Sequence, residues 1–415
     1  MNMNKKPIIR FNNYIDEWEQ RKLDECLSEI TYGFTNPMSD TETGPWKITA
    51  KDIVDGKIDY SSARHTSPIE YDGLTDKSKP LIGDLLLTKD GTLGRTAIVN
   101  AENICINQSV ALLRFNEKCS PQYAKTLLDT PMYQKQMIDD AGGGTIKHIY
   151  ITKVDKMLIS IPSKEEQEQL VSFFNNLDNL ITLHQRMCDE TKELKKFMLQ
   201  KMFPKNGEQV PEIRFAGFTD EWEHRKLGTL CERVTRKNKN GESDLPLTIA
   251  SQYGLIDQRD FFNKVVAAKD MSNYYLLKKG EFAYNKSYSN GFDYGSIKRL
   301  NAYEQGCLST LYICFGITSD DIESDYLECF FDTLKWYSDI TMICAEGARN
   351  HGLLNVDTKA FFDEVTIEMP SSKEEQRKIS AYLSNLDNLI TLHQCKCDDL
   401  KEVKKYMLQN MFPKN

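Results

Sequence analysis

The sequence lacks the long apolar runs that membrane spans and export signals require. No 18-residue apolar stretch occurs in its 415 residues, and the first eleven, MNMNKKPIIRF, contain no apolar segment of a signal peptide. It also lacks any CxxC pair, and its 11 cysteines stand at irregular positions. We therefore expect a cytoplasmic protein without membrane contact, with reduced thiols and without a zinc site.

Sequence motifs for catalysis are absent as well. The chain has no GxxxxGK[ST] phosphate loop, no HExxH or other metal-binding spacing, and no GxSxG elbow. The segment Asn36-Pro37-Met38-Ser39 lacks the second proline and the aromatic residue of an amino-methyltransferase motif. Acidic pairs such as Glu165-Glu166 suit the dipole of a helix start and not acid–base catalysis. These absences favour a non-catalytic chain that holds no metal and no cofactor of its own.

Positive charge is in short supply, since 61 acidic residues outnumber 53 basic ones and give a net charge of −8. This excess argues only weakly against a protein that binds polyanions. Salt screens charges over about 8 Å at physiological ionic strength, so the local charge of a folded face decides such binding.

What the sequence does contain is an internal repeat. The nine residues LDNLITLHQ occur at 177–185 and again at 386–394. An opening segment also recurs, as IRFNNYIDEWEQRKL at 9–23 and IRFAGFTDEWEHRKL at 213–227. The two offsets, 209 and 204, show that the segments between them differ in length by five residues. Each half of the chain therefore has a repeated opening, a divergent middle and a repeated helix.

The repeated nonapeptides lie within two predicted helices of about 40 residues. Apolar residues at steps of three and four predict one face of each helix, packed against the other copy in a seam. Each helix is expected to begin at a capping box, Ser163 with Glu166 and Ser372 with Glu375, and to end at a Met-Phe-Pro sequence. The predicted seam contains Leu170, Phe174, Leu177, Ile181 and His184 in the first helix and Ile379, Leu383, Leu386, Ile390 and His393 in the second, and continues through Leu194 and Val403. The two histidines are interpreted as buried polar residues that set the register, with a role as ligands as the weaker alternative.

The divergent middles, residues 31–160 and 235–369, contain short β-like runs separated by glycine and asparagine turns. Predicted strands include residues 85–87, 97–99, 110–113 and 311–314. We expect an α/β protein with two β-rich domains separated by two long antiparallel helices, related by a pseudo-twofold axis that brings Asn415 near Met1. The predicted boundaries are 1–162 for the first domain, 163–203 for its helix, 204–212 for a linker, 213–371 for the second domain and 372–412 for its helix.

Four features together carry a family resemblance: the DEWE…RKL openings, the Gly-Asp and Gly-Glu stretches before hydrophobic runs, the Ser-Lys-Glu-Glu-Gln helix starts and the two-copy layout. Through them the chain resembles the specificity (S) subunit of type I restriction–modification systems. The resemblance covers essentially the whole chain. It implies two target-recognition domains, each reading one half of a bipartite, asymmetric DNA site across a non-specific spacer. It also implies that the helices act as a ruler and dock two modification (methyltransferase) subunits, which use S-adenosylmethionine to methylate adenine at N6. Two restriction subunits, motor nucleases that use ATP and Mg²⁺, can join them.

Polar residues in the loops of the two middles are candidate contacts to double-stranded DNA. Arginine and lysine bond guanine in the major groove, and asparagine and glutamine bond adenine. For each residue alone, a solvated loop position or a phosphate contact is the stronger interpretation. The candidates are Lys89, Arg95, Asn107, Gln108, Lys147 and His148 in the first middle and Lys286, Tyr288, Asn290, Arg349, Asn350 and His351 in the second. The rival hypothesis for the whole chain is a non-catalytic, two-headed protein-interaction scaffold on a coiled-coil spacer.

Overall fold

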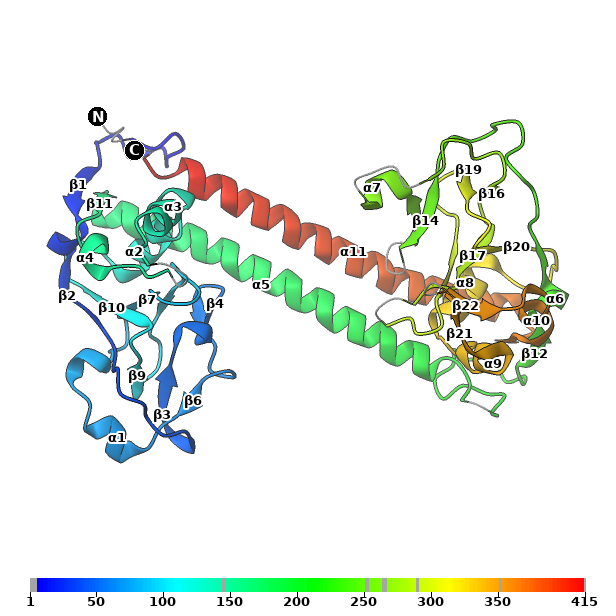
Figure 1. Cartoon of the computed structure of the whole chain (residues 1–415), viewed down its shortest axis with the longest axis horizontal. Helices are drawn as coiled ribbons and strands as arrows, with labels where there is room; N and C mark the ends of the chain where they lie inside the picture. Colours follow the sequence, from blue (N-terminus) through cyan, green and yellow to red (C-terminus); the bar gives the residue numbers. More distant parts are fainter. Residues whose placement is uncertain are drawn as a thin grey trace. The chain divides into compact units, whose positions relative to one another are not determined.

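The computed structural model describes residues 6–143, 147–205, 207–250, 254–262, 267–288, 291–350 and 353–413. The chain folds into two compact units (Figure 1). Unit 1 consists of Met1–Gln185 and Gln394–Asn415, and unit 2 consists of Arg186–His393. Each unit therefore contains part of both long helices.

The two long helices are α5 (Lys164–Lys201) and α11 (Lys373–Asn410), each of 38 residues. Helix α5 begins in unit 1 and ends in unit 2, and α11 does the reverse. Both end before a buried Met-Phe pair and a proline that cannot continue a helix. The prediction of two long helices is confirmed, and each observed helix begins one residue after and ends two residues before its predicted bounds.

The capping boxes were predicted only half correctly. Ser163 Oγ accepts a hydrogen bond from Glu166 N at 3.3 Å, as expected for an N-cap. The Glu166 carboxylate, however, accepts hydrogen bonds from Arg10 Nε at 2.7 Å and Nη2 at 2.8 Å. In unit 2, Arg214 binds Glu375 in the same way, at 2.7 and 2.9 Å. Because both carboxylates are about 1% exposed, each needs a cation, and the arginine of each Ile-Arg-Phe opening supplies it.

Each opening segment also bonds the end of the helix that reaches its unit. Ile9 N donates to Asn410 O at 2.9 Å in unit 1, and Ile213 N donates to Lys201 O at 2.9 Å in unit 2. The predicted meeting of Met1 and Asn415 concerns residues outside the described ranges. Both opening segments are therefore bonded to the end of a long helix in the same way. In unit 2 that helix precedes the opening segment in the chain, whereas in unit 1 it is the last helix of the chain.

Unit 1 is built on a four-stranded sheet with the order β2 (Leu27–Tyr32), β10 (Val110–Phe115), β7 (Leu85–Thr88), β8 (Thr96–Ile98). One face of the sheet packs against α2 (Pro121–Leu128), α3 (Pro131–Asp139) and the start of α5, and the other packs against a second sheet. Alternate residues of β7 divide between these cores, Leu85 and Leu87 on one side and Leu86 on the other, as the two-residue period of a strand requires. The second sheet has the order β6 (Arg64–His65), β3 (Thr41–Ile48), β9 (Ile104–Ile106), and β1 (Glu19–Lys22) pairs separately with β11 (Leu158–Ile161). Shorter elements are α1 (Pro68–Asp72), α4 (Ile151–Val154), β4 (Ile53–Val54), β5 (Lys57–Ile58) and 3-10 turns at Leu23–Cys26, Ala50–Asp52 and Asp76–Ser78.

Unit 2 repeats the four-stranded sheet in the same order. It consists of β13 (Cys231–Arg233), β20 (Ile313–Ile317), β17 (Phe282–Asn285) and β18 (Ser296–Arg299), while β12 (Glu223–Lys226) pairs with β23 (Thr366–Met369). The predicted strand at 311–314 begins two residues late, at Ile313, because Leu311 lies in a turn and is 57% exposed. The second layer differs from that of unit 1, with β14 (Leu247–Ala250) on β15 (Gly254–Asp257) and β16 (Tyr275–Lys278) on β19 (Gln305–Leu308). The remaining elements are α6 (Leu227–Leu230), α7 (Gln258–Phe262), α8 (Ser324–Asp332), α9 (Tyr337–Ile343), α10 (Thr358–Glu364), β21 (Cys344–Asn350) and β22 (Leu353–Val356). The expected mixed, β-rich fold with an internal repeat is confirmed.

The tryptophan of each DEWE motif is a core residue. Trp18 is 1% exposed and packs edge-on against Tyr123 and against Phe412, which follows α11. Trp222 makes the equivalent contacts with Tyr326 and with Phe203, which follows α5. The repeated opening and the repeated helix end therefore meet in one aromatic cluster per unit.

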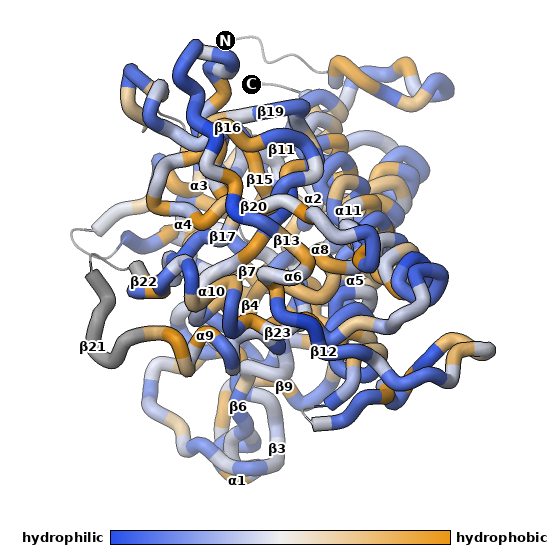
Figure 2. The backbone as a smooth tube through the Cα atoms, turned by 90° about the vertical axis from the view of Figure 1, so that its right-hand side faces the viewer, coloured by the Kyte–Doolittle hydropathy of each residue, from blue (hydrophilic) through white to orange (hydrophobic). Residues whose placement is uncertain are grey.

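The two long helices pack antiparallel within each unit. In unit 1, Asp178 Oδ1 lies 2.5 Å from Lys404 Nζ, and the Ile181 carbonyl accepts from the Cys397 thiol at 3.9 Å, so the numbering rises on α5 as it falls on α11. In unit 2 the equivalent pair is Asp387 with Lys195, at 2.8 Å. Near the label of α11, Figure 2 shows both hydrophobic and hydrophilic segments of the tube. A helix with one buried and one exposed face carries both kinds of residue.

The predicted continuation of the seam through Leu194 and Val403 is wrong. Both side chains are 42% exposed, whereas the next residues, Lys195 and Lys404, are partly buried and pair across the helices. Seam positions follow one another at alternating steps of three and four residues. After Thr191 the next step is four residues, which places Lys195 and not Leu194 in the seam. Each lysine packs its stem along the seam and pairs its ammonium group at the edge.

Unit 2 contains a charge network at this point that gives its stability a defined pH dependence. Asp332, at the end of α8, lies 3.1 Å from Lys195 and 2.7 Å from Lys298. Burial alone would raise the pKa of Asp332, but Lys298 and Lys195 outweigh it and lower the pKa. Because the folded pKa lies below the unfolded value of about 3.9, this stabilisation is present above that value and is lost as the pH falls through the folded pKa.

We expect Asp332→Asn to lower the free energy of unfolding by roughly 2 kcal/mol at pH 7, because it leaves two partly buried lysines short of a counter-charge. The denaturant midpoints at pH 7 and pH 3 should then lie closer together than in the wild-type chain. Asp325→Asn is the control, since Asp325 is 65% exposed and its pair with Arg299 contributes little. An unchanged gap between the two midpoints in Asp332→Asn would show that the network does not have this role.

Candidate nucleic-acid interface

The predicted contact residues Lys89 and Lys286 occupy equivalent places in the two units. Each follows a central strand, β7 or β17, and its carbonyl is bonded by a later segment of the same unit. Ile149 N donates to Lys89 O at 2.9 Å, and Leu354 N donates to Lys286 O at 3.0 Å. The end of each central strand is thus bonded by a later segment, the loop at Ile149 in unit 1 and β22 in unit 2.

In unit 1 the charge of Lys89 is already paired. Its Nζ lies 2.8 Å from Asp90 Oδ2, and His148 Nδ1 lies 2.6 Å from the other oxygen of that carboxylate. The same Nζ stands 5.4 Å from the ring centre of Tyr32. Burial would raise the pKa of Asp90, but hydrogen bonds from Lys89 and His148 lower it. The cluster is a neutralised set of donors and acceptors at the end of the sheet.

The Asn107–Gln108 turn lies beside this cluster. Ser109 O accepts from both Lys89 N and Asp90 N, at 2.9 and 3.3 Å. Asn107 Oδ1 accepts from Ser109 N and Oγ, at 3.1 and 2.5 Å, so its carbonyl shapes the turn, while Gln108 is exposed. The structure therefore brings Lys89, Asn107, Gln108 and His148 together.

Two further predicted residues of unit 1 lie on neighbouring loops. Arg95 is exposed at the start of β8, where its Nη1 donates to Ile53 O at 3.0 Å and its backbone N donates to Thr88 Oγ1. Lys147 is exposed directly before His148. Residues 144–146 of the glycine-containing loop lie outside the described ranges.

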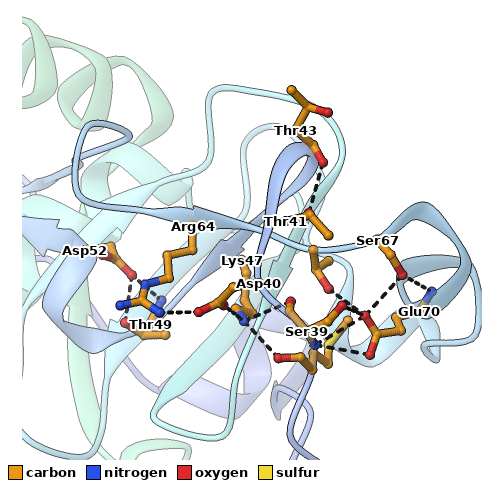
Figure 3. A network of polar contacts seen from close by, with 12 residues as sticks. Ser39, Asp40, Thr41, Thr43, Lys47, Thr49, Asp52, Arg64, Ser67 and Glu70 are labelled. Carbon is orange, nitrogen blue, oxygen red and sulfur yellow. Dashed lines mark hydrogen bonds and ion pairs between the residues drawn. The ribbon is translucent and has the colours of Figure 1, made fainter.

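The second sheet of unit 1 carries a polar network of its own (Figure 3). Asp40 points toward Lys47 and Arg64 and pairs with both, and these cations lower the pKa of Asp40. Glu70, on α1, bonds Ser39 and Ser67. The two cations of this network, Lys47 and Arg64, are balanced by two carboxylates, Asp40 and Glu70.

In unit 2, Lys286 lies near a second cation, Arg233. Burial lowers the pKa of Lys286, and the nearby Arg233 lowers it further. Arg233 Nη2 donates to the Tyr275 hydroxyl at 3.0 Å, and Lys237 Nζ stands 3.7 Å from the centre of the Tyr275 ring. Sequence reasoning missed Arg233 and Lys237, although the basic run Arg-Lys-Asn-Lys at 236–239 was a signal for this segment.

The other predicted residues of unit 2 are only partly described. Tyr288 is 53% exposed, two residues after Lys286. Arg349 and Asn350 lie in β21, whose backbone pairs with β22, the strand that bonds Lys286 O through Leu354. Asn290 and His351 lie outside the described residues.

Of the ten predicted seam residues, seven are buried and three are partly buried. Leu170, Phe174 and Leu177 belong to the core of unit 1, and Ile379, Leu383 and Leu386 belong to the core of unit 2. His393 is 8% exposed, whereas His184, Ile181 and Ile390 are half-buried.

A row of exposed apolar residues runs beside the seam on both helices. We call it the helix ridge. In unit 1 the ridge contains Leu180, Leu183, Val403 and Tyr406, and in unit 2 it contains the repeat equivalents Leu389, Leu392, Leu194 and Phe197, all 39–56% exposed. Each of these residues directly precedes a seam position, so all lie on the same flank of their helix. Because the helices are antiparallel, these flanks meet on one side of the pair within each unit. Apolar side chains clustered on a surface are typical of a protein-docking site.

Within the described ranges, no cluster of three or more histidine, cysteine or acidic side chains could hold a metal ion. No helix in those ranges combines the length and the apolar character that crossing a bilayer would require.

Comparison with known families decides the class of the chain. A family model described as the type I restriction modification DNA specificity domain matches residues 16–193 and again residues 219–402. The chain belongs to this family. The double match coincides with the internal repeat, so each half of the chain is one specificity domain.

One relative and two solved structures are similar to this chain at 25% identity or below. A type I restriction enzyme MjaX specificity subunit of Methanocaldococcus jannaschii is 25% identical over 224 residues, which span 51% of this chain and 52% of that protein. The match therefore spans about half the length of this relative. The crystal structure of the S subunit of the type I restriction–modification system from M. genitalium shares the fold, with a TM-score of 0.64 at 16% identity over 99% of this chain and all of that one. A second structure, from work on complex assembly and conformational transition of the type I restriction–modification system, has a TM-score of 0.50 at 18% identity over 95% of this chain and 97% of its own.

Proposed function

We propose that this chain is the DNA-recognition subunit of a type I restriction–modification enzyme. Each unit reads one half of a bipartite, asymmetric DNA site, and the chain itself carries out no catalysis. The observation that carries the proposal is one frame built twice with different polar clusters at the same place. The frame includes the sheet order, the Arg–Glu pair and the tryptophan cluster, whereas the surroundings of Lys89 and Lys286 differ.

Different clusters on equal frames are what two unlike half-sites need. Each wrong base pair in a site typically costs about 1–3 kcal/mol, so two readers of a few base pairs each multiply their discrimination. In the proposal, the helices shared by the two units set the spacing between the half-sites, and therefore the length of the unspecified spacer.

The helix ridge supports the docking of two modification subunits. The ridge occurs once in each unit with repeat-equivalent residues, and one partner copy on each ridge gives two copies per chain. In this proposal the partners bring S-adenosylmethionine and methylate adenine, and two restriction subunits add ATP- and Mg²⁺-dependent translocation and cleavage.

The proposal is tested by capturing the chain together with an adenine methyltransferase and measuring how the assembly binds DNA. We expect binding to one bipartite duplex to exceed binding to unrelated duplexes by at least about a thousandfold. The logarithm of the binding constant should fall steeply with the logarithm of salt concentration. Equal binding to all duplexes would contradict sequence recognition and would favour a protein-interaction scaffold.

A further inference from the structure

We propose that Arg233, Lys237 and Lys286 of unit 2 form a binding site for a backbone phosphate of DNA, and that unit 1 has no equivalent. The inference rests on the proposed function and identifies a chemical contact of one reading unit. In this inference, phosphate contacts contribute more to the DNA affinity of unit 2 than to that of unit 1. Unit 1 depends more on the shape and hydrogen bonding of its half-site.

The three cations come from separate segments of unit 2. Arg233 ends β13, Lys237 lies four residues later, and Lys286 follows β17. Tyr275, on β16, connects the first two, since its hydroxyl accepts from Arg233 and its ring lies under Lys237 Nζ. Arg233 is close enough to Lys286 to lower its pKa. The fold thus gathers like charges that repel one another.

None of the three side chains forms an ion pair with another described residue. Glu281, whose charge acts on the same buried Cys314 as Arg233 and Lys237, is bound to Arg236 at 2.9 and 2.7 Å. Clustered cations without a counter-charge cost folding free energy, and an anionic ligand offsets that cost.

A phosphate fits this cluster better than a base edge. Lysine is a compact point charge suited to phosphate, whereas guanine is read most specifically by the planar fork of arginine. The one arginine already spends an Nη2 donor on Tyr275, which holds its guanidinium in place. Contacts of this kind position a protein on a duplex and carry no sequence information directly.

Unit 1 differs at the equivalent positions. Lys89, the counterpart of Lys286, is neutralised by Asp90, which also binds His148. The strand position that carries Arg233 in β13 is Ile30 in β2, because Ile30 pairs with Leu113 as Arg233 pairs with Phe315. Among the described residues, the positive cluster therefore occurs in unit 2 alone.

The test compares Lys237→Gln, Lys286→Gln and Lys89→Gln in the chain assembled with its methyltransferase. The probes are the preferred duplex and an unrelated duplex of equal length, titrated between 50 and 200 mM salt, a range over which phosphate contacts change affinity strongly. Each unit 2 variant should weaken binding to both duplexes by about the same factor, roughly tenfold. It should also reduce the slope of log K against log salt by about one. Lys89→Gln should reduce the slope by less than half as much.

Lys279→Gln is the control, since Lys279 pairs with Glu304 on the exposed turn between β16 and β17. The inference is overturned if the unit 2 variants change which half-site is preferred without changing the slope, because these lysines would then read bases. It is also overturned if they lower the melting temperature and leave the slope unchanged, because the cluster would then only support the fold. A wild-type assembly that binds no duplex preferentially would instead count against the proposed function.

Discussion

Replacing Leu389 and Leu392 by aspartate should reduce the number of modification subunits bound to the chain from two to one. These leucines are 44% and 52% exposed on the ridge of unit 2. Placing two carboxylates in an apolar contact costs several kcal/mol, which weakens binding by at least about a hundredfold. The same change at Leu180 and Leu183 should remove the copy on unit 1, and the fourfold variant should bind neither. Native mass spectrometry of the co-expressed subunits counts the copies directly.

Matched controls come from the same helices. Thr182 and Thr391 are exposed repeat equivalents that follow a seam residue instead of preceding it, so they lie on the opposite flank. Their replacement by aspartate should leave both copies bound. A fourfold ridge variant that keeps its helical circular dichroism and still binds two modification subunits would show that docking occurs elsewhere.

Replacing residues 31–160 by the equivalent residues of the chain's own second half, 234–368, should produce a protein that reads the half-site of unit 2 twice. Both middles join the same frame, with β1 paired to β11 in one unit and β12 paired to β23 in the other. Methylation of the original site should be lost, because two or three mismatched base pairs reduce affinity by at least about a hundredfold. The new site should keep the half that unit 2 reads.

The reciprocal replacement, with residues 31–160 in both places, is the matched control and should double the other half-site. The readout is the set of methylated adenines in the DNA of cells that express each variant with the modification subunit. If a single exchange altered both halves of the site together, the two units could not be independent readers.

The sequence predicted the helices well because their signals are local. The Ser-x-x-Glu starts and the Met-Phe-Pro ends bracket the observed Lys164–Lys201 and Lys373–Asn410 closely. The error at Leu194 has a physical reason. The seven-residue register placed Lys195 in the seam, but the prediction chose the neighbouring apolar residue. The acidic partners of Lys195, Asp387 and Asp332, are distant in sequence, so nothing local indicated that a lysine could occupy this position.

The candidate contacts were harder to predict because they depend on tertiary neighbours. The sequence indicated Lys89 and Lys286 because each follows a predicted strand. It did not indicate that an acidic residue neutralises Lys89 whereas a second cation lies near Lys286. Asp90 stood next to Lys89 in the sequence, whereas Arg233 reaches Tyr275 across 42 residues. The partner of Glu166 was likewise missed, since Arg10 lies 156 residues away. The ridge leucines were visible within the repeated nonapeptide, as Leu180 and Leu183, but apolar residues beside a seam are interpreted as buried until the register is known.

The central claim, that two unlike units on one frame read two half-sites, is tested most directly by single-molecule sequencing of DNA from cells that express this chain with its methyltransferase. The account predicts methylated adenines in two different short motifs separated by a fixed number of unspecified base pairs, and none at that site when the chain is omitted. Methylation in one continuous motif, or a pattern that does not change when the chain is omitted, would contradict it.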